Sequence, residues 1–184
     1  MTHMPDLTIL TPCKNPGRNL VRTLQSVNSL TEYGINIQHI ILCSESGSME
    51  RFIPNCESDW RTIITASDTG PYDALNLGAR LAKGRYVQVL NVGDIIVSPW
   101  YLSDIAAQSC EVLSFGAYDE YAANLRNLTT FQDLRLDSVG RHEAILVRRD
   151  VLLRAPFDMS LPVKADRDQM MAIGALCYIF FLFV

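Results

Sequence analysis

The segment at positions 67–94, which reads SDTGPYDALNLGARLAKGRYVQVLNVGD, constrains the fold of this chain more than any other stretch. The Gly70-Pro71 pair is a turn signal, and small or apolar residues then recur at helical spacing. The positions that share one face of this predicted helix are Ala74, Leu75, Gly78, Ala79 and Ala82. A face made of small side chains predicts close packing of the helix on a sheet.

A buried strand is predicted directly after this helix. Gly84 stands where a helix C′ glycine belongs, and the apolar run at positions 86–90 is typical of a buried strand. The polar sequence N-V-G-D follows at positions 91–94. Because ligands of open α/β sheets bind beyond the carboxyl ends of the strands, this sequence is a candidate binding site.

The rest of the chain alternates between predicted strands and helices. Strands are predicted at positions 7–11, 39–43, 62–66, 112–115 and 144–147. A helix is predicted behind the turn cluster at positions 15–17, on apolar residues that recur at helical spacing: Leu20, Val21, Leu24, Val27 and Leu30. This alternation predicts a single α/β domain over 1–184, with a mostly parallel sheet covered by helices on both faces.

The net charge argues against a nucleic-acid-binding surface, and the spacing of the cysteines argues against a zinc site. A formal net charge of −4 and a sequence pI near 5.3 argue against nucleic-acid binding, which normally needs a basic patch. The five cysteines form no C-x-x-C pair and no cluster with histidine, so zinc is not expected. Their odd number, in a chain without a recognisable signal peptide, fits the reducing cytoplasm.

Two motifs in the segment 67–94 match a known family in order and spacing. The first is D-x-G-x-Y-D-A-x-N-x-G, and the second is L-N-x-G-D. The residues that carry them are Asp68, Gly70, Tyr72, Asp73, Ala74, Asn76 and Gly78, followed by Leu90, Asn91, Gly93 and Asp94. With the opening segment TILTPCKNPGRN and the late segments RHEAILVRR and FDMSLPVKADRD, the chain resembles the family 2 glycosyltransferases over positions 1–170.

This resemblance implies a GT-A fold, a Rossmann-like α/β architecture, and a polysaccharide-biosynthesis type of enzyme. Such an enzyme moves a sugar, with inversion, from a nucleotide-diphosphate sugar, in most cases a UDP-sugar, to a saccharide or lipid-linked acceptor. The residues expected to bind the nucleotide sugar are Thr11, Pro12, Glu45, Asp68, Asn76, Asn91 and Gly93. Ser44 is the alternative to Glu45, and Asp68 also has a plain interpretation as a turn former beside Gly70.

The resemblance also implies a catalytic base in the late segment. Asp166 matches the family's base position, and Asp168 is the competitor two residues on. If the segment is helical, the two carboxylates diverge by about 200°, so only one of them is expected to face the site. His142 is a candidate contact to the acceptor or to a phosphate, and a structural histidine is the alternative.

Asp94 is the candidate metal ligand. The resemblance implies a divalent cation that bridges phosphate oxygens and neutralises the leaving diphosphate. Asn91 and Gly93 stand where the commoner D-x-D motif has other acids, which leaves one protein carboxylate in this segment. Such an oxygen-only shell suits Mg²⁺ or Mn²⁺.

Several alternatives stay open from the sequence. Another nucleotide-using enzyme such as a nucleotidyltransferase is one, and a catalytically degraded remnant of the fold is another.

The apolar segment 172–184 is shorter than the roughly 20 residues of a spanning helix. We expect it to be a core strand or helix end; a membrane-contacting tail and a C-terminally truncated chain are the alternatives. The expected location is the cytoplasm, with the inner face of the membrane as a variant.

Overall fold

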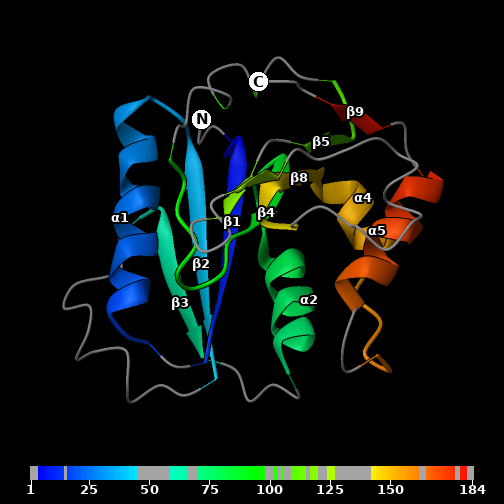
Figure 1. Ribbon diagram of the computed structural model, residues 1–184, viewed down its shortest axis with the longest axis horizontal. Helices are drawn as coiled ribbons and strands as arrows, with labels where there is room; N and C mark the ends of the chain where they lie inside the picture. Colours follow the sequence, from blue (N-terminus) through cyan, green and yellow to red (C-terminus); the bar gives the residue numbers. More distant parts are fainter. Residues whose placement is uncertain are drawn as a thin grey trace.

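The computed structural model describes residues 4–14, 16–44, 59–65, 70–97, 102, 105, 109–114, 117–119, 124–126, 142–161, 165–176 and 179–181. Its main sheet has seven strands in the order β3-β2-β1-β4-β8-β5-β9 (Figure 1). The strands are β1 (Leu7–Cys13), β2 (Ile37–Cys43), β3 (Arg61–Thr65), β4 (Tyr86–Val89), β5 (Val112–Ser114), β8 (Ile145–Arg148) and β9 (Ile179–Phe181). A separate antiparallel pair is formed by β6 (Ala117–Asp119) and β7 (Asn124–Arg126).

The sheet is mostly parallel, as predicted. The strand β1 is parallel to both β2 and β4, and β3 is parallel to β2. The exception is β8, which runs antiparallel to β4 and to β5, while β9 is parallel to β5. The reversed direction of β8 matters for the site, because it brings the start of β8 beside the end of β4.

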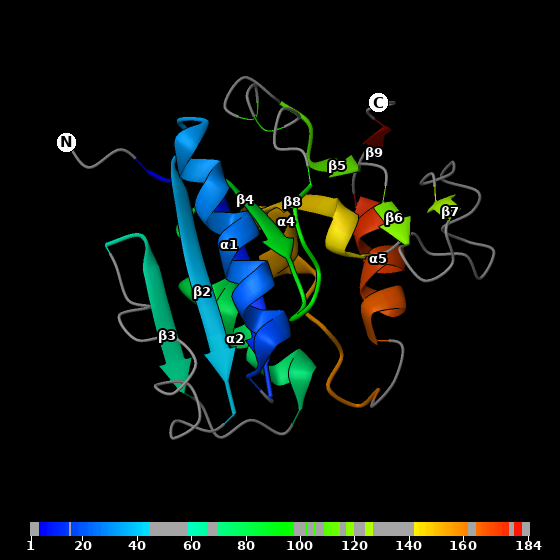
Figure 2. The same cartoon turned by 60° about the vertical axis from the view of Figure 1, so that its left-hand side comes forward.

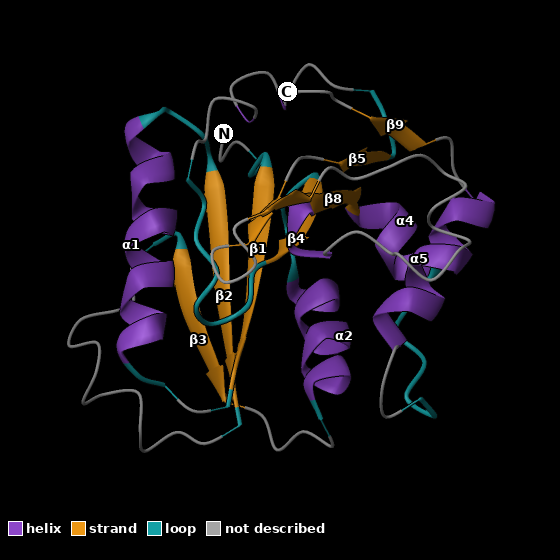
Figure 3. Ribbon diagram, viewed as in Figure 1, coloured by secondary structure: helices purple, strands orange, loops and turns teal. Residues whose placement is uncertain are grey.

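Helices cover both faces of the sheet (Figures 2 and 3). They are α1 (Arg18–Glu32), α2 (Pro71–Leu81), α4 (Arg149–Arg154) and α5 (Ala165–Leu176), and a short 3-10 turn, η4 (His142–Ala144), precedes β8. Successive residues of a strand point to opposite faces. Ile9 of β1 accordingly shares a core cluster with Val27 of α1, whereas Leu10 shares one with Leu75 of α2 and Ile173 of α5. The predicted α/β architecture is therefore confirmed.

The small-residue face of α2 packs closely on the sheet, as the sequence indicates. Ala74, Leu75, Gly78, Ala79 and Ala82 are all buried. A Cβ at Gly78 would lie 2.8 Å from Leu42 Cδ1 and 3.0 Å from Leu10 Cδ2. A larger residue at this position would require the Leu10 and Leu42 side chains to shift, so Gly78 favours the close approach of α2 to β1 and β2.

The prediction that Gly84 is the C′ glycine of α2 is wrong. The helix ends at Leu81, and Ala82 is its C-cap. Gly84 instead lies against the start of β1, where an added Cβ would come within 2.4 Å of the Thr8 backbone nitrogen. The Gly84 N–H donates to Thr8 Oγ1 at 2.8 Å, so this glycine fixes how the chain enters β4 beside β1.

The predicted strand boundaries differ from the observed ones by one or two residues. β1 continues past position 11, β2 begins before position 39, and the strand predicted at 144–147 is found at 145–148 with Ala144 in η4. Ala66 and Phe115, the last residues of two predicted strands, lie outside the described residues. The chain order alone does not reveal that β8 lies between β4 and β5.

The apolar segment at 172–184 contains the end of a helix and an edge strand. α5 continues to Leu176, and β9 pairs with β5 in the register Val112↔Ile179. How far the side chains of 174–184 are buried lies outside what the structure describes, so membrane contact by this segment stays a prediction. In the described part of the chain, no helix is both long enough and apolar enough to cross a bilayer.

A buried polar network ties the first three strands to α1. Arg61 donates from Nε to His39 Nδ1 at 3.0 Å and from Nη2 to Asn28 Oδ1 at 2.6 Å. Because the guanidinium is always a donor, Nδ1 of His39 is the acceptor and Nε2 carries the proton. That nitrogen therefore donates to Thr11 Oγ1 at 2.9 Å. Burial, and secondly the charge of Arg61, lower the pKa of His39 from 6.5 to about 3.

Replacing Gly84 with alanine is expected to destabilise the protein by about 1–3 kcal/mol, because the new methyl group would overlap backbone atoms of β1. Urea unfolding measures the change. Gly17→Ala is the control without a clash, since a Cβ at Gly17 meets nothing within 4 Å; a loss of stability there would reflect the N-cap position of Gly17 in α1. Equal stability of the Gly84 variant and the wild type would contradict the close contact with β1.

Stability is expected to fall as the pH drops below about 6.5, because the unfolded chain then protonates His39 and the folded chain does not. The contribution of His39 is fully present above pH 6.5 and is lost as the pH falls toward 3. Between pH 7.5 and 5.5 the free energy of unfolding should decrease by about 1.4 kcal/mol from this group.

Urea unfolding of the wild type and of His39→Gln at both pH values measures the contribution of His39. Other titrating groups change the free energy of unfolding of both proteins alike, so the difference between the two pH dependences belongs to His39. An NMR titration of His39 in the folded wild type gives a second measurement. Protonation of the folded-state ring near pH 6 would refute the expected pH dependence.

Candidate functional site

The sheet has a topological switch point between β1 and β4. From β1 the chain continues outward to β2 and β3, and then returns to place β4 on the other side of β1. α1 connects β1 to β2 on one face, and α2 connects β3 to β4 on the opposite face. Ligands of open α/β sheets bind at the carboxyl ends of the strands at such a point. In Figure 1 the arrowheads of β1–β3 point down to this edge, where α1, α2 and α5 also begin.

The sequence N-V-G-D at 91–94 forms a tight turn at this edge. The Asp94 N–H donates to the Asn91 carbonyl at 3.1 Å, and Gly93 has a φ of 106°, which favours glycine. Thr23 of α1 holds the turn in place: its hydroxyl accepts from Gly93 N–H at 2.9 Å and donates to the Asp94 carbonyl at 2.8 Å. The sequence analysis missed Thr23, which looks like any other residue on the buried face of α1.

Glu143 is a second residue that sequence reasoning missed. The carboxylate oxygen Oε1 of Glu143 accepts a hydrogen bond from Asn91 Nδ2 at 2.5 Å, and its main-chain carbonyl accepts from Gln88 Nε2 at 2.7 Å. Glu143 lies in η4, directly before β8, and the antiparallel pairing of β8 with β4 brings it there. The side chain of the neighbouring His142 lies outside the described part, so its predicted contact with an acceptor or phosphate stays a prediction.

Thr11 takes part in the buried polar network. It is fully buried, and its hydroxyl is bonded to His39 on the face covered by α1. The buried hydroxyl is part of the core network, and the expected contact of Thr11 with a nucleotide base stays a prediction. Pro12, the next residue, is half-buried at the same strand end, and its contact with a nucleotide stays a prediction.

Asp166 lies in the first turn of α5 and faces α2. The hydroxyl of Tyr72 donates to Asp166 Oδ1 at 3.3 Å, and the Tyr72 ring stacks on Phe157 with centroids 5.2 Å apart. Asp168, by contrast, is exposed. Its divergence from Asp166 is the expected one for a helix, and Asp166 stays the predicted base.

Asn76 joins two segments of the protein. Its Nδ2 donates to the Phe157 carbonyl at 3.0 Å, and its Oδ1 accepts from the Phe157 N–H at 2.9 Å. This pair of bonds gives Asn76 a structural role between α2 and the segment before α5. A contact between Asn76 and a nucleotide sugar stays a prediction, as do the contacts of Glu45 and Asp68, which lie outside the described residues.

The donors at the switch point fit a hard divalent cation. Asp94 carries a carboxylate and Asn91 an amide oxygen, and both residues are half-buried. Mg²⁺ and Mn²⁺ prefer such oxygen donors, with water and phosphate completing the shell. Within the described ranges, no three His, Cys, Asp or Glu side chains gather as a metal site on their own.

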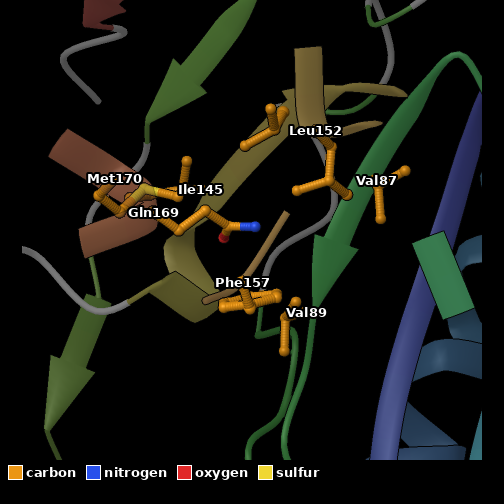
Figure 4. A pocket seen from close by; sticks show the side chains of 8 residues that line it. Val87, Val89, Ile145, Leu152, Phe157, Gln169 and Met170 are labelled. Carbon is orange, nitrogen blue, oxygen red and sulfur yellow. The ribbon is translucent and has the colours of Figure 1, made fainter. Parts of the chain in front are cut away.

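A small apolar cavity lies elsewhere, between the sheet and α4 and α5 (Figure 4). It is lined by residues such as Val89, Phe157 and Gln169, and has a volume of about 20 Å³. That is room for about one water molecule, and the Gln169 amide is already bonded to the Ala155 carbonyl at 2.9 Å. The cavity is a gap in core packing and too small for a sugar.

The chain is similar to named glycosyltransferases in sequence and to solved glycosyltransferase structures in fold. No family model matches the chain. Two curated proteins of Mycobacterium tuberculosis, from strains CDC 1551 and H37Rv, are each named an uncharacterized glycosyltransferase. Each is 31% identical to the chain over 115 residues. The match covers 62% of this chain and 42% of either relative, so the chain spans less than half of their length.

Solved structures with a similar fold come from several organisms. S. aureus TarS in complex with UDP matches with a TM-score of 0.72 at 14% identity, over 96% of this chain and 57% of that one. The mannosyltransferase PcManGT from Pyrobaculum calidifontis, in complex with GDP-Man and Mn²⁺, matches with a TM-score of 0.68 at 15% identity, over 98% and 55%. The bifunctional IspDF from Campylobacter jejuni matches less well, with a TM-score of 0.58 at 13% identity, over 96% and 49%. The chain has the GT-A fold of glycosyltransferases.

Proposed function

We propose that this chain transfers a sugar from a nucleotide-diphosphate sugar to a hydroxyl group of a saccharide or lipid-linked acceptor. The observation that carries the proposal is the turn at 91–94, which places Asp94 directly after β4 at the switch point of the sheet. The glycosyltransferase names of the sequence relatives support it. The nucleotide and Mn²⁺ in the titles of the structural neighbours support it further.

Asp94 would hold the diphosphate end of the donor. A bound Mg²⁺ or Mn²⁺ would neutralise charge on the leaving phosphate oxygen as the glycosidic bond breaks. Thr23 keeps the Asp94 main chain in place through the two hydrogen bonds to the turn, so the carboxylate is held at the strand end. Pro12, Asp68, and Glu45 or Ser44 are the proposed contacts to the nucleoside, for which we propose uridine.

Asp166 would act at the acceptor. In a single displacement with inversion, the acceptor oxygen bonds to the anomeric carbon while the bond to the diphosphate oxygen breaks. The acceptor proton passes to the Asp166 carboxylate. A positioned carboxylate of this kind contributes about 10²–10⁴-fold to the rate. Tyr72 would orient the carboxylate through its hydroxyl, and the stacking on Phe157 limits movement of the Tyr72 ring.

An assay of radiolabelled nucleotide sugars with Mn²⁺ tests the proposal, with sugar release to water or to saccharide acceptors as the measurement. We expect turnover with a UDP-sugar. A chain that binds nucleotide but transfers and hydrolyses no sugar would be a non-catalytic remnant. Release of pyrophosphate from a nucleoside triphosphate would indicate a nucleotidyltransferase instead.

Asp94→Ala is expected to abolish Mn²⁺-dependent binding of UDP, because it removes the carboxylate that the turn presents at the strand end. Calorimetric titration of UDP with and without Mn²⁺ measures the effect. The fold should survive, since Asp94 is only half-buried. Glu32→Ala, an exposed acid at the far end of α1, is the control. Wild-type affinity in the Asp94 variant would eliminate this residue as the ligand.

Asp166→Asn should lower turnover by about 10²-fold or more with donor affinity almost unchanged, because it keeps the shape and removes the base. Tyr72→Phe should lower turnover less, since the carboxylate remains. Steady-state kinetics of both variants, with the exposed Asp168→Asn as control, give the comparison. A large loss in the Asp168 variant with a normal Asp166 variant would mean that Asp168 is the base.

A further inference from the structure

We propose that Glu143 is a positioning residue that sets the orientation of the Asn91 side-chain amide, so that Asn91 presents its oxygen Oδ1 to the cation and diphosphate. The proposal rests on the proposed function in one respect, namely that the ligand at this edge is a nucleotide diphosphate with a divalent cation. It adds a residue from a distant part of the chain to that site.

The chemistry of the two groups supports the orientation. An ionised carboxylate can only accept hydrogen bonds, whereas a side-chain amide has an NH₂ donor on one side and an oxygen acceptor on the other. Glu143 Oε1 lies 2.5 Å from Asn91 Nδ2, so the NH₂ of Asn91 faces Glu143. The oxygen Oδ1 must then face away from Glu143. With a neutral hydrogen-bonding partner in place of Glu143, either orientation of the amide would be possible.

The main chain around each of the two partners, Glu143 and Asn91, is held by a side chain from another part of the fold. The Glu143 carbonyl accepts from Gln88 Nε2 at 2.7 Å, and Gln88 is almost fully buried, with 3% exposed. On the other side, the Thr23 hydroxyl binds the turn that contains Asn91. The pair is therefore pre-organised, and a ligand would not have to order it.

The cluster also contains a buried acceptor that is not hydrogen-bonded within the described part of the chain. Gln88 Oε1, on the same amide that binds Glu143, has no hydrogen-bond partner among the residues that the structure describes. A buried oxygen of this kind needs a donor or a cation, because leaving it unpaired is costly. Independently of the Asn91–Glu143 contact, it indicates that a ligand or water completes this polar cluster.

The sequence explains why such a residue is required. A carboxylate at position 91 would present an oxygen on either side, whereas the asparagine found there presents an oxygen on one side only. An asparagine can replace an acid as an oxygen ligand only if its amide is oriented. Glu143 would supply that orientation.

The test compares Glu143→Ala with the double variant Glu143→Ala, Asn91→Asp, using calorimetric titration of UDP in the presence of Mn²⁺. Loss of a residue that orients a metal ligand typically lowers metal affinity by about 10–100-fold, and we expect a loss in that range for Glu143→Ala. The double variant should regain most of the affinity, because an aspartate at 91 presents an oxygen in either orientation. A merely structural role of Glu143 would give no such recovery.

Glu111→Ala is the matched control, because Glu111 is a half-buried acid that pairs with Arg148 at the opposite end of β8. If Glu143→Ala does not fold, Glu143→Gln replaces it. The glutamine amide can pair with either side of Asn91, so we expect a smaller loss that Asn91→Asp again restores. Wild-type affinity in the Glu143 variants, or a double variant as weak as the single one, would overturn the proposal.

UDP binding tests the role of Glu143, whereas sugar transfer tests the proposed function, so the two can fail separately. A wild type that binds UDP with Mn²⁺ but transfers no sugar would contradict the proposed function, and the binding comparison would still decide the role of Glu143. A wild type whose UDP binding does not depend on Mn²⁺ would contradict the role of Glu143.

Discussion

The pairing of β4 with β1 is the contact on which the rest of the structure depends. Four residue pairs, from Leu7↔Tyr86 to Leu10↔Val89, join the two parallel strands. Gly84 makes this register possible at its start, because no larger residue fits against the Thr8 backbone. With the register set, the four residues at 91–94 extend beyond the strand at the edge where β1 also ends. A shift of one residue would turn every side chain of β4 to the opposite face.

The two faces of the sheet are stabilised by different chemistry. On the face of α2, packing is apolar and close, and Gly78 allows the helix backbone to approach Leu10 and Leu42. On the face of α1, a polar network runs from Thr11 through His39 and Arg61 to α1. Buried polar groups stabilise a fold only when they are paired, and each group of this network has a partner at hydrogen-bond distance. This network holds α1 in place, and α1 in turn carries Thr23 to the turn at 91–94.

The candidate site is assembled from segments that are far apart in the chain. Thr23 comes from α1, Asn91 and Asp94 follow β4, and Glu143 precedes the antiparallel strand β8. Asp166 faces the start of α2 through Tyr72. The reversed direction of β8 is decisive here, because in a wholly parallel sheet the start of this strand would lie at the opposite edge.

The sequence by itself determined most strands of the main sheet, the helices α1 and α2 and the position of the turn, whereas α4, β6 and β7 were not predicted. Periodicity and turn residues are local signals, and they correctly predicted a helix after Gly70-Pro71, the strand before position 91 and the buried small-residue face. Motifs read in order indicated the GT-A fold. Only the tertiary structure decided the contacts of Thr11, Gly84, Thr23 and Glu143. Each contact joins residues that lie at least 28 positions apart in the chain, such as Thr11 and His39, and such contacts leave no periodic signal. Local propensity determines which segments are strands and helices, whereas strand order and direction determine which side chains meet.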